Sequence, residues 1–175
     1  MNTHIIILRG VNVSGKNKLP MKPFQSELLN RGLQNVQTYI QSGNIVLQSE
    51  KTTSEIQEVI EKVLRDNFEI DVPVQVWSVQ AWKEVIFANP YAEMPEKQQY
   101  FTFLNSESEV KTIDVDAKED GFELTAHCVY VNAVGGYGKT KLTNNFFEKK
   151  LKVQATTRNL KTTITLLSLA ENLTK

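Results

Sequence analysis

The chain is poor in the residues that build metal sites and disulfides. Its 175 residues include one cysteine, Cys128, and two histidines. A lone cysteine excludes an intramolecular disulfide and is typical of proteins from a reducing compartment. Because the histidines and the cysteine do not have the spacing of metal ligands, no metal site is predicted.

Long apolar runs are also absent. A membrane-spanning helix needs about 20 consecutive apolar residues, and no run in this chain approaches that length. The N-terminal stretch MNTHIIILRG lacks the basic start and the small-residue cleavage site of a signal peptide. We therefore expect a cytoplasmic protein without a membrane partner.

The charge sums to zero but is unevenly distributed along the chain, which has 20 basic and 20 acidic residues. Residues 9–31 and 139–161 are strongly basic, whereas residues 107–123 hold seven acidic side chains. This segregation predicts a positive face on a neutral protein. The alternative to a positive face is that these charges are scattered over the surface and solvated.

The first half of the chain alternates strand and helix signals. The expected elements are a strand at 4–9, a helix containing Met21, Phe24 and Leu28, strands at 36–41 and 45–49, a helix opened by Ser54, and a strand at 72–78. Ser42-Gly43-Asn44 is typical of a tight hairpin, and Ser54 with Gln57 forms a capping-box pattern. The order β-α-β-β-α-β is that of the ferredoxin-like split unit.

The second half shows a similar mixture of hairpins and helices. Its expected elements are a helix capped by Ser78, strands at 99–104, 121–126 and 127–132, a helix from about Thr143, a short strand at 153–156, and a final helix over 156–172. We therefore predict an α+β fold of two ferredoxin-like (α-β plait) halves with antiparallel sheets packed together. The halves are expected at residues 1–78 and 79–175.

Two glycine-containing loops come close to a phosphate-binding loop, whose pattern is G-x-x-x-x-G-K-[ST]. In ILRGVNVSGKNKLPM, Gly10, Gly15 and Lys16 fit, but Asn17 stands where a hydroxyl residue should bind Mg²⁺. In AVGGYGKT, Gly138, Lys139 and Thr140 fit the pattern, but Ala133 stands where the first glycine belongs. The expected hairpin also argues against the parallel sheet of such enzymes. Glycine loops with lysines can nevertheless hold an anion without hydrolysing it.

Three separated motifs carry a family resemblance. The stretches LRGVNVSGKNKLPM, TYIQSGNIVLQS and ATTRNLKT resemble, in order, the signatures of DUF1697, an uncharacterised bacterial family. The resemblance covers nearly the whole chain and implies two ferredoxin-like halves. It implies no activity, so neither a reaction nor a cofactor is assigned. Leu160 departs from the aromatic residue that the family often has at this position.

The same motifs and the second glycine loop supply the candidate ligand-binding residues. The loops at 10–18, 41–44, 135–141 and 156–162 are expected to gather into one polar, positively charged cleft. The expected sources of charge are Arg9, Lys16, Lys139 and Arg158, and the residues expected to orient the ligand are Asn12, Ser42, Asn44 and Asn159. Taken one at a time, the amides are also explained by hydrogen bonds within turns.

The last motif is expected at the start of the final helix. There the hydroxyls of Thr156 and Thr157 would cap free N–H groups, and the helix dipole would favour an anion beside Arg158. Arg158 could hold a phosphate or a carboxylate through two parallel hydrogen bonds.

The favoured hypothesis is a protein that binds a small anionic ligand, specifically a phosphorylated one, with any reaction unassigned. A non-sequence-specific nucleic-acid-binding protein is the first alternative, because the basic segment 139–161 could contact a phosphate backbone. The strands at 4–9 and 45–49 contain no aromatic residue, which disfavours base stacking of the RNA-recognition type. A protein-interaction module is the second alternative. The oligomeric state is not predicted.

Overall fold

The computed structural model describes residues 1–175, which form two compact units. Unit 1 consists of Met1–Lys83 together with Thr165–Lys175, and unit 2 consists of Glu84–Ile164. Each unit contains one four-stranded antiparallel sheet, and the chain has five α-helices. These sheets confirm the predicted α+β fold, and they are consistent with two ferredoxin-like halves.

The sheet of unit 1 has the strand order β2-β3-β1-β4. Its elements are β1 (Asn2–Leu8), α1 (Met21–Asn30), β2 (Gln34–Tyr39), β3 (Asn44–Ser49), α2 (Thr53–Phe68) and β4 (Val74–Ser78). The helix α3 (Val79–Phe87) follows β4 directly, and the Oγ of Ser78 accepts a hydrogen bond from Ala81 N at 3.1 Å. The predicted cap of this helix by Ser78 is therefore confirmed.

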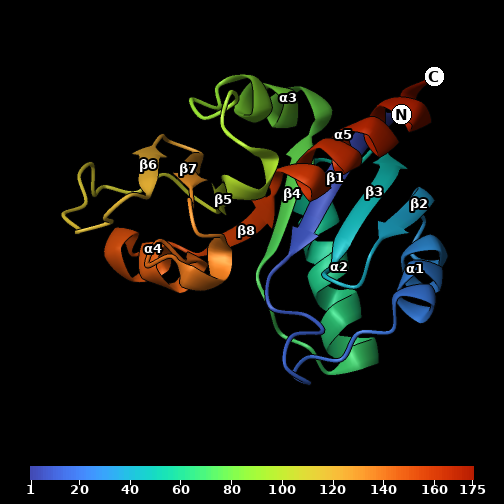
Figure 1. The fold of residues 1–175 in the computed structure, drawn as a ribbon. Helices are drawn as coiled ribbons and strands as arrows, with labels where there is room; N and C mark the ends of the chain where they lie inside the picture. Colours follow the sequence, from blue (N-terminus) through green and yellow to red (C-terminus); the bar gives the residue numbers. More distant parts are fainter. The chain divides into compact units, whose positions relative to one another are not determined.

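The central strand of unit 1, β1, is buried on both faces. Ile6 and Leu8 share a core with Phe24 of α1 and Ile60 of α2. The other face carries Thr3, because successive side chains of a strand point to opposite sides. There the helix α5 (Leu160–Thr174) crosses the sheet, as Figure 1 shows, with α2 behind the sheet and the C-terminal part of α5 in front of it.

The sheet of unit 2 has the order β6-β7-β5-β8, which repeats the order of the first sheet. Its elements are β5 (Gln99–Leu104), β6 (Gly121–Leu124), β7 (Cys128–Asn132), α4 (Asn144–Leu151) and β8 (Ala155–Asn159), with short 3₁₀ turns at Glu96–Gln98 and Tyr137–Lys139. One difference from unit 1 is the connection from β5 to β6. Residues 105–120 form no helix there, whereas α1 occupies the corresponding connection in unit 1.

Two helix starts differ from the sequence prediction. The N-cap of α2 is Thr52 and not Ser54, because the Thr52 side chain and Glu55 bond each other's backbone N–H groups. The last helix begins at Leu160 and not near residue 156, since residues 155–159 pair with β5 as the strand β8. Arg158 therefore belongs to a strand.

The capping box makes a testable difference between two neighbouring hydroxyl residues. Thr52→Ala removes the acceptor that Glu55 N contacts at 3.3 Å, so we expect it to lower the free energy of unfolding by about 1 kcal/mol. Ser54→Ala is the matched control and should change it by less than about 0.5 kcal/mol. Urea unfolding followed by circular dichroism measures both values. Equal losses in the two variants would contradict the assignment of the cap.

Candidate functional site

The loop between β1 and α1 folds as a small hairpin and not as a phosphate-binding loop. Asn12 N donates to Asn17 O at 3.0 Å, and Lys16 N donates to Val13 O at 2.9 Å. Ser14 and Gly15, at the tip, both have positive φ, the pattern of a type I′ turn. Because these N–H groups bond within the loop and the helix starts only at Met21, the loop does not wrap a phosphate with its backbone.

Asn12 fastens this hairpin to the turn between β2 and β3. Its Nδ2 donates to Gln41 O at 2.7 Å and to Leu19 O at 3.0 Å, and its Oδ1 accepts from Leu19 N at 2.8 Å. A Cβ on Gly43 would lie 2.7 Å from Leu8 Cβ and from Val11 Cγ2. The loops 10–18 and 41–44 therefore lie against each other in unit 1.

Ser42 and Asn44 stabilise the turn between β2 and β3. Asn44 is fully buried, and its Nδ2 donates to Ser42 Oγ at 2.8 Å and to Tyr39 O at 3.1 Å. The turn chemistry considered as the alternative explanation thus accounts for Asn12 and Asn44.

The close approach at Gly43 predicts a strong glycine requirement. Gly43 has φ +77°, and alanine there would combine a strained backbone with two short contacts. We expect Gly43→Ala to lower the free energy of unfolding by about 3 kcal/mol.

The matched control is Gly15→Ala, at φ +74° with nothing within 4 Å of the added Cβ. It should cost only about 1 kcal/mol, from backbone strain alone. Urea unfolding of both variants measures the two losses of unfolding free energy. Similar losses would contradict the close packing of the two loops at Gly43.

Lys139 lines a cavity of about 400 Å³ in unit 2. Its walls are the end of the 105–120 connection and the loop after β7, and they include Lys118, Glu119, Asp120, Val134, Lys139 and Lys141. The two walls are tied together, because Asp120 Oδ1 accepts from Val134 N at 2.8 Å and Lys141 Nζ donates to Asp116 O at 3.4 Å. Lys118 and Lys141 were not among the predicted site residues.

Arg158 and Asn159 lie at the end of β8 and not on a helix. Arg158 is half-buried, its Nη1 donates to Thr157 O at 3.0 Å, and burial lowers its pKa to about 10. Asn159 caps α5, since its Oδ1 accepts from Thr162 N at 2.9 Å. The predicted cap by Thr156 and Thr157 is wrong because both residues belong to the strand.

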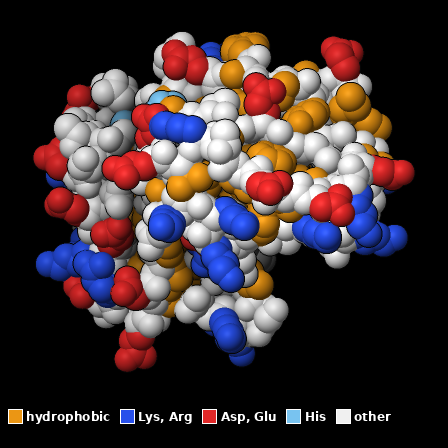
Figure 2. All heavy atoms as spheres, turned by 90° about the vertical axis from the view of Figure 1, so that its left-hand side faces the viewer, with side chains coloured by type: hydrophobic (Ala, Val, Ile, Leu, Met, Phe, Trp, Pro, Cys, Tyr) orange, Lys and Arg blue, Asp and Glu red, His pale blue; other side chains and the backbone are white.

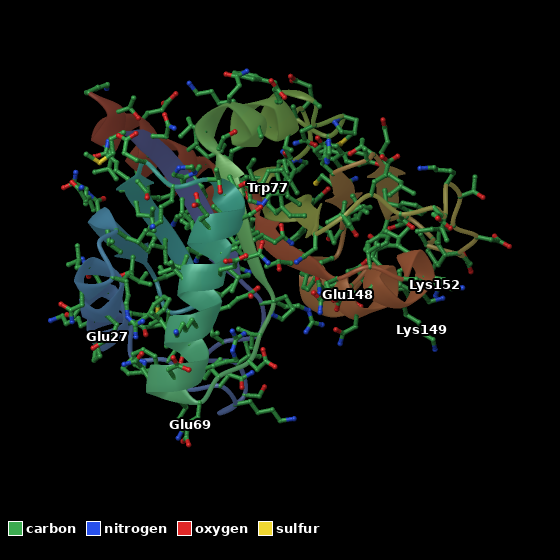
Figure 3. All side chains as sticks on the ribbon, turned by 180° about the vertical axis from the view of Figure 1, so that it is seen from behind. Glu27, Glu69, Trp77, Glu148, Lys149 and Lys152 are labelled. Carbon is green, nitrogen blue, oxygen red and sulfur yellow. The ribbon has the colours of Figure 1, made fainter.

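Most lysines of the basic segment 139–161 are solvated. Figure 3 shows Lys149 and Lys152 extending away from α4, whereas Glu148 lies toward β8, where its Oε2 accepts from Ala155 N at 3.1 Å. The face drawn in Figure 2 mixes basic and acidic side chains. On this face the charges therefore do not form one continuous positive surface.

The structure contains no group of three or more metal-ligating side chains. Cys128 is fully buried, which raises the pKa of its thiol well above the ordinary value and disfavours a thiolate nucleophile.

His4 is buried in β1 with no hydrogen bond to either ring nitrogen. Burial lowers the pKa of His4, and the nearby Ser49 backbone opposes this to a smaller extent.

The lowered pKa of His4 predicts a loss of stability in mild acid. Below its ordinary pKa of 6.5 the unfolded chain binds a proton more readily than the folded chain, so the free energy of unfolding falls as the pH decreases from about 7.5 to about 5.5. His4→Leu should reduce this fall, while His127→Gln controls for removing an exposed imidazole. Urea unfolding at the two pH values is the measurement, and an unchanged slope in His4→Leu would contradict the assignment.

The structure thus brings together Asn12, Ser42 and Asn44 in unit 1, where Arg9 precedes the hairpin and Lys16 lies within it. Lys139, Arg158 and Asn159 belong to unit 2. That all four loops line one cleft stays a prediction. Of the missed residues, Lys141 had a sequence signal, the glycine loop that ends in Lys139-Thr140-Lys141, whereas Lys118 had none.

Comparisons with known proteins give a family and a fold. A family model described as "Protein of unknown function (DUF1697)" matches residues 1–130. The chain is similar to the solved structure of a conserved bacterial protein from Streptococcus pneumoniae, with 22% identity and a TM-score of 0.73 over 97% of this chain and 98% of that chain. No curated protein matches the chain. No helix of the structure is both long enough and apolar enough to span a bilayer.

Proposed function

The chain belongs to DUF1697, a family of proteins of unknown function, and we propose that it binds a small anionic ligand, specifically a phosphorylated one. The observation that carries this proposal is the cavity of about 400 Å³ that Lys118, Lys139 and Lys141 line. Its volume lies within the range of small-molecule sites. Three ammonium groups on one cavity are the kind of point charges that hold a phosphate.

The acidic residues of this cavity restrict the ligand. Asp120 is engaged with the backbone of Val134, but Glu119 is exposed on the same wall. A carboxylate beside bound phosphate is unfavourable unless it accepts a hydrogen bond from the ligand. We therefore favour a ligand that carries hydroxyl groups next to its phosphate, such as a sugar phosphate, over inorganic phosphate.

The residues of unit 1 have supporting roles in the proposal. Arg9 precedes the hairpin and Lys16 lies within it, so both supply positive charge there, and the Ser42 hydroxyl lies in the adjoining turn. Asn12 and Asn44 act indirectly, because their hydrogen bonds hold the two loops that carry these groups. The fixed loops would present the charges to a ligand without a large ordering cost.

Arg158 is the fourth cation of unit 2 in the proposal, after Lys118, Lys139 and Lys141. Its pKa, lowered to about 10 by burial, still leaves the guanidinium charged at neutral pH. An anion beside it would offset the cost of burying this charge. Asn159 stabilises the start of α5, because its Oδ1 accepts a hydrogen bond from Thr162 N.

A thermal-shift screen tests the proposal. Sugar phosphates and nucleotides are expected to raise the melting temperature by about 5 °C at about 100 times Kd, because they bind only the folded chain. Lys139→Ala should weaken the best ligand about tenfold, by removing a charge worth about 1.4 kcal/mol.

Lys149→Ala is the matched control, since Lys149 extends away from α4. It should leave the affinity unchanged. The proposal fails if no phosphorylated compound raises the melting temperature and Arg158→Ala changes nothing. Binding of a labelled oligonucleotide that weakens steeply with salt would instead favour the nucleic-acid alternative.

A further inference from the structure

Unit 1 contains a second cavity, of about 620 Å³, that the proposed function does not use. Its walls come from three places in the chain, namely the start of β1, the junction of β4 with α3, and the end of α5. Thr3, Ser78, Val79, Lys83, Glu171 and Thr174 are among the lining residues. The volume is again within the range of small-molecule sites.

The walls of this cavity are held in place by tertiary hydrogen bonds. The hydroxyl oxygens of Thr3 and Thr174 lie 3.0 Å apart, and Gln48 Nε2 donates to Leu173 O at 2.9 Å. These two bonds fix the end of α5 on β1 and β3. The cavity is therefore preformed and does not depend on a ligand for its shape.

Most charged groups of the cavity wall are paired. The Met1 ammonium pairs with Glu50, and Lys175 is exposed to solvent. Lys83 Nζ lies 2.6 Å from Glu171 Oε1, so the ammonium and the carboxylate from α3 and α5 neutralise each other. The rest of the wall is largely apolar, and its polar groups are the hydroxyls of Thr3, Ser78 and Thr174, the Asn2 amide and the His4 imidazole. A charged ligand would lose hydration there without meeting an opposite net charge.

We infer that this cavity is a binding site for an uncharged, largely apolar small molecule that carries one hydrogen-bonding group. The apolar body of the ligand fills the cavity, and its polar group bonds a threonine or serine hydroxyl. This site differs from the lysine-lined cavity of unit 2 in position, since it lies in unit 1, and in chemistry, since its Lys83 is paired with Glu171.

Indole is a suitable probe because it is uncharged, bicyclic and carries one N–H donor. Titration of ¹⁵N-labelled protein should shift the amide signals of Thr3, Val79 and Glu171. Tryptamine and indole-3-carboxylate add a positive and a negative charge to the same ring, and each is expected to bind about tenfold more weakly. No shift of these amides with indole, or tighter binding of either charged probe, would overturn the inference.

Two kinds of variant locate the site. Val79→Phe should fill the cavity and abolish the shifts, whereas Val134→Phe makes the same change in the cavity of unit 2 and should leave indole binding unchanged. Shifts that survive Val79→Phe, or that vanish in Val134→Phe, would overturn the assignment to this cavity. The spectrum itself reports whether each variant is folded.

The ion pair provides a test that does not require filling the cavity. Glu171→Gln leaves the Lys83 charge without its partner, so the preference should move toward indole-3-carboxylate. Lys83→Met leaves Glu171 charged, and the preference should move toward tryptamine. If neither variant changes the order of the three probes, the pair does not set the selectivity and the inference fails.

Discussion

The burial of β1 on both faces is the constraint on which the structure of unit 1 depends. Ile5, Ile6, Ile7 and Leu8 are completely inaccessible to solvent, so each side of the sheet needs an apolar cover. The helices α1 and α2 cover one side. The other side is crossed by the end of α5, where Leu166 and Ala170 are buried. The last residues of the chain therefore belong to the same compact unit as the first.

Local signals predicted the fold well because they act over a few residues. The turn at Ser42-Gly43-Asn44, the apolar stripe of α2 and the strand at 99–104 each follow from neighbouring side chains. Two helix starts were ambiguous. Thr52 and Ser54 both have a partner three residues later, and the structure uses the pair with Glu55, whose negative charge suits a helix N-terminus.

The start of α5 was ambiguous for a different reason. Threonines at 156 and 157 suit either a cap or a strand, since β-branched residues favour extended backbone. Pairing with β5 decides in favour of the strand, and the cap passes to Asn159. A single sequence does not contain that long-range pairing.

The candidate site shows the same division between local and tertiary information. The motifs identified the loop at 10–18, the turn at 42–44 and Lys139, because glycines and amides mark unusual backbone conformations. They could not show that Asn12 bonds the backbone of the other loop, nor that Asn44 is buried. Lys118 was missed because residues 105–120 have no periodicity, and an acidic stretch gives no sign that it borders a basic cavity.

The two sheets share one strand order, yet only the first has a helix in its first connection. The irregular segment 105–120 makes few backbone hydrogen bonds that a change of length would disrupt, unlike α1. Its apolar side chains Val110, Ile113, Val115 and Ala117 pack against the core of unit 2, so changes of length are best tolerated at its exposed positions. Because the segment forms one wall of the cavity, such changes would reshape that wall on a common scaffold.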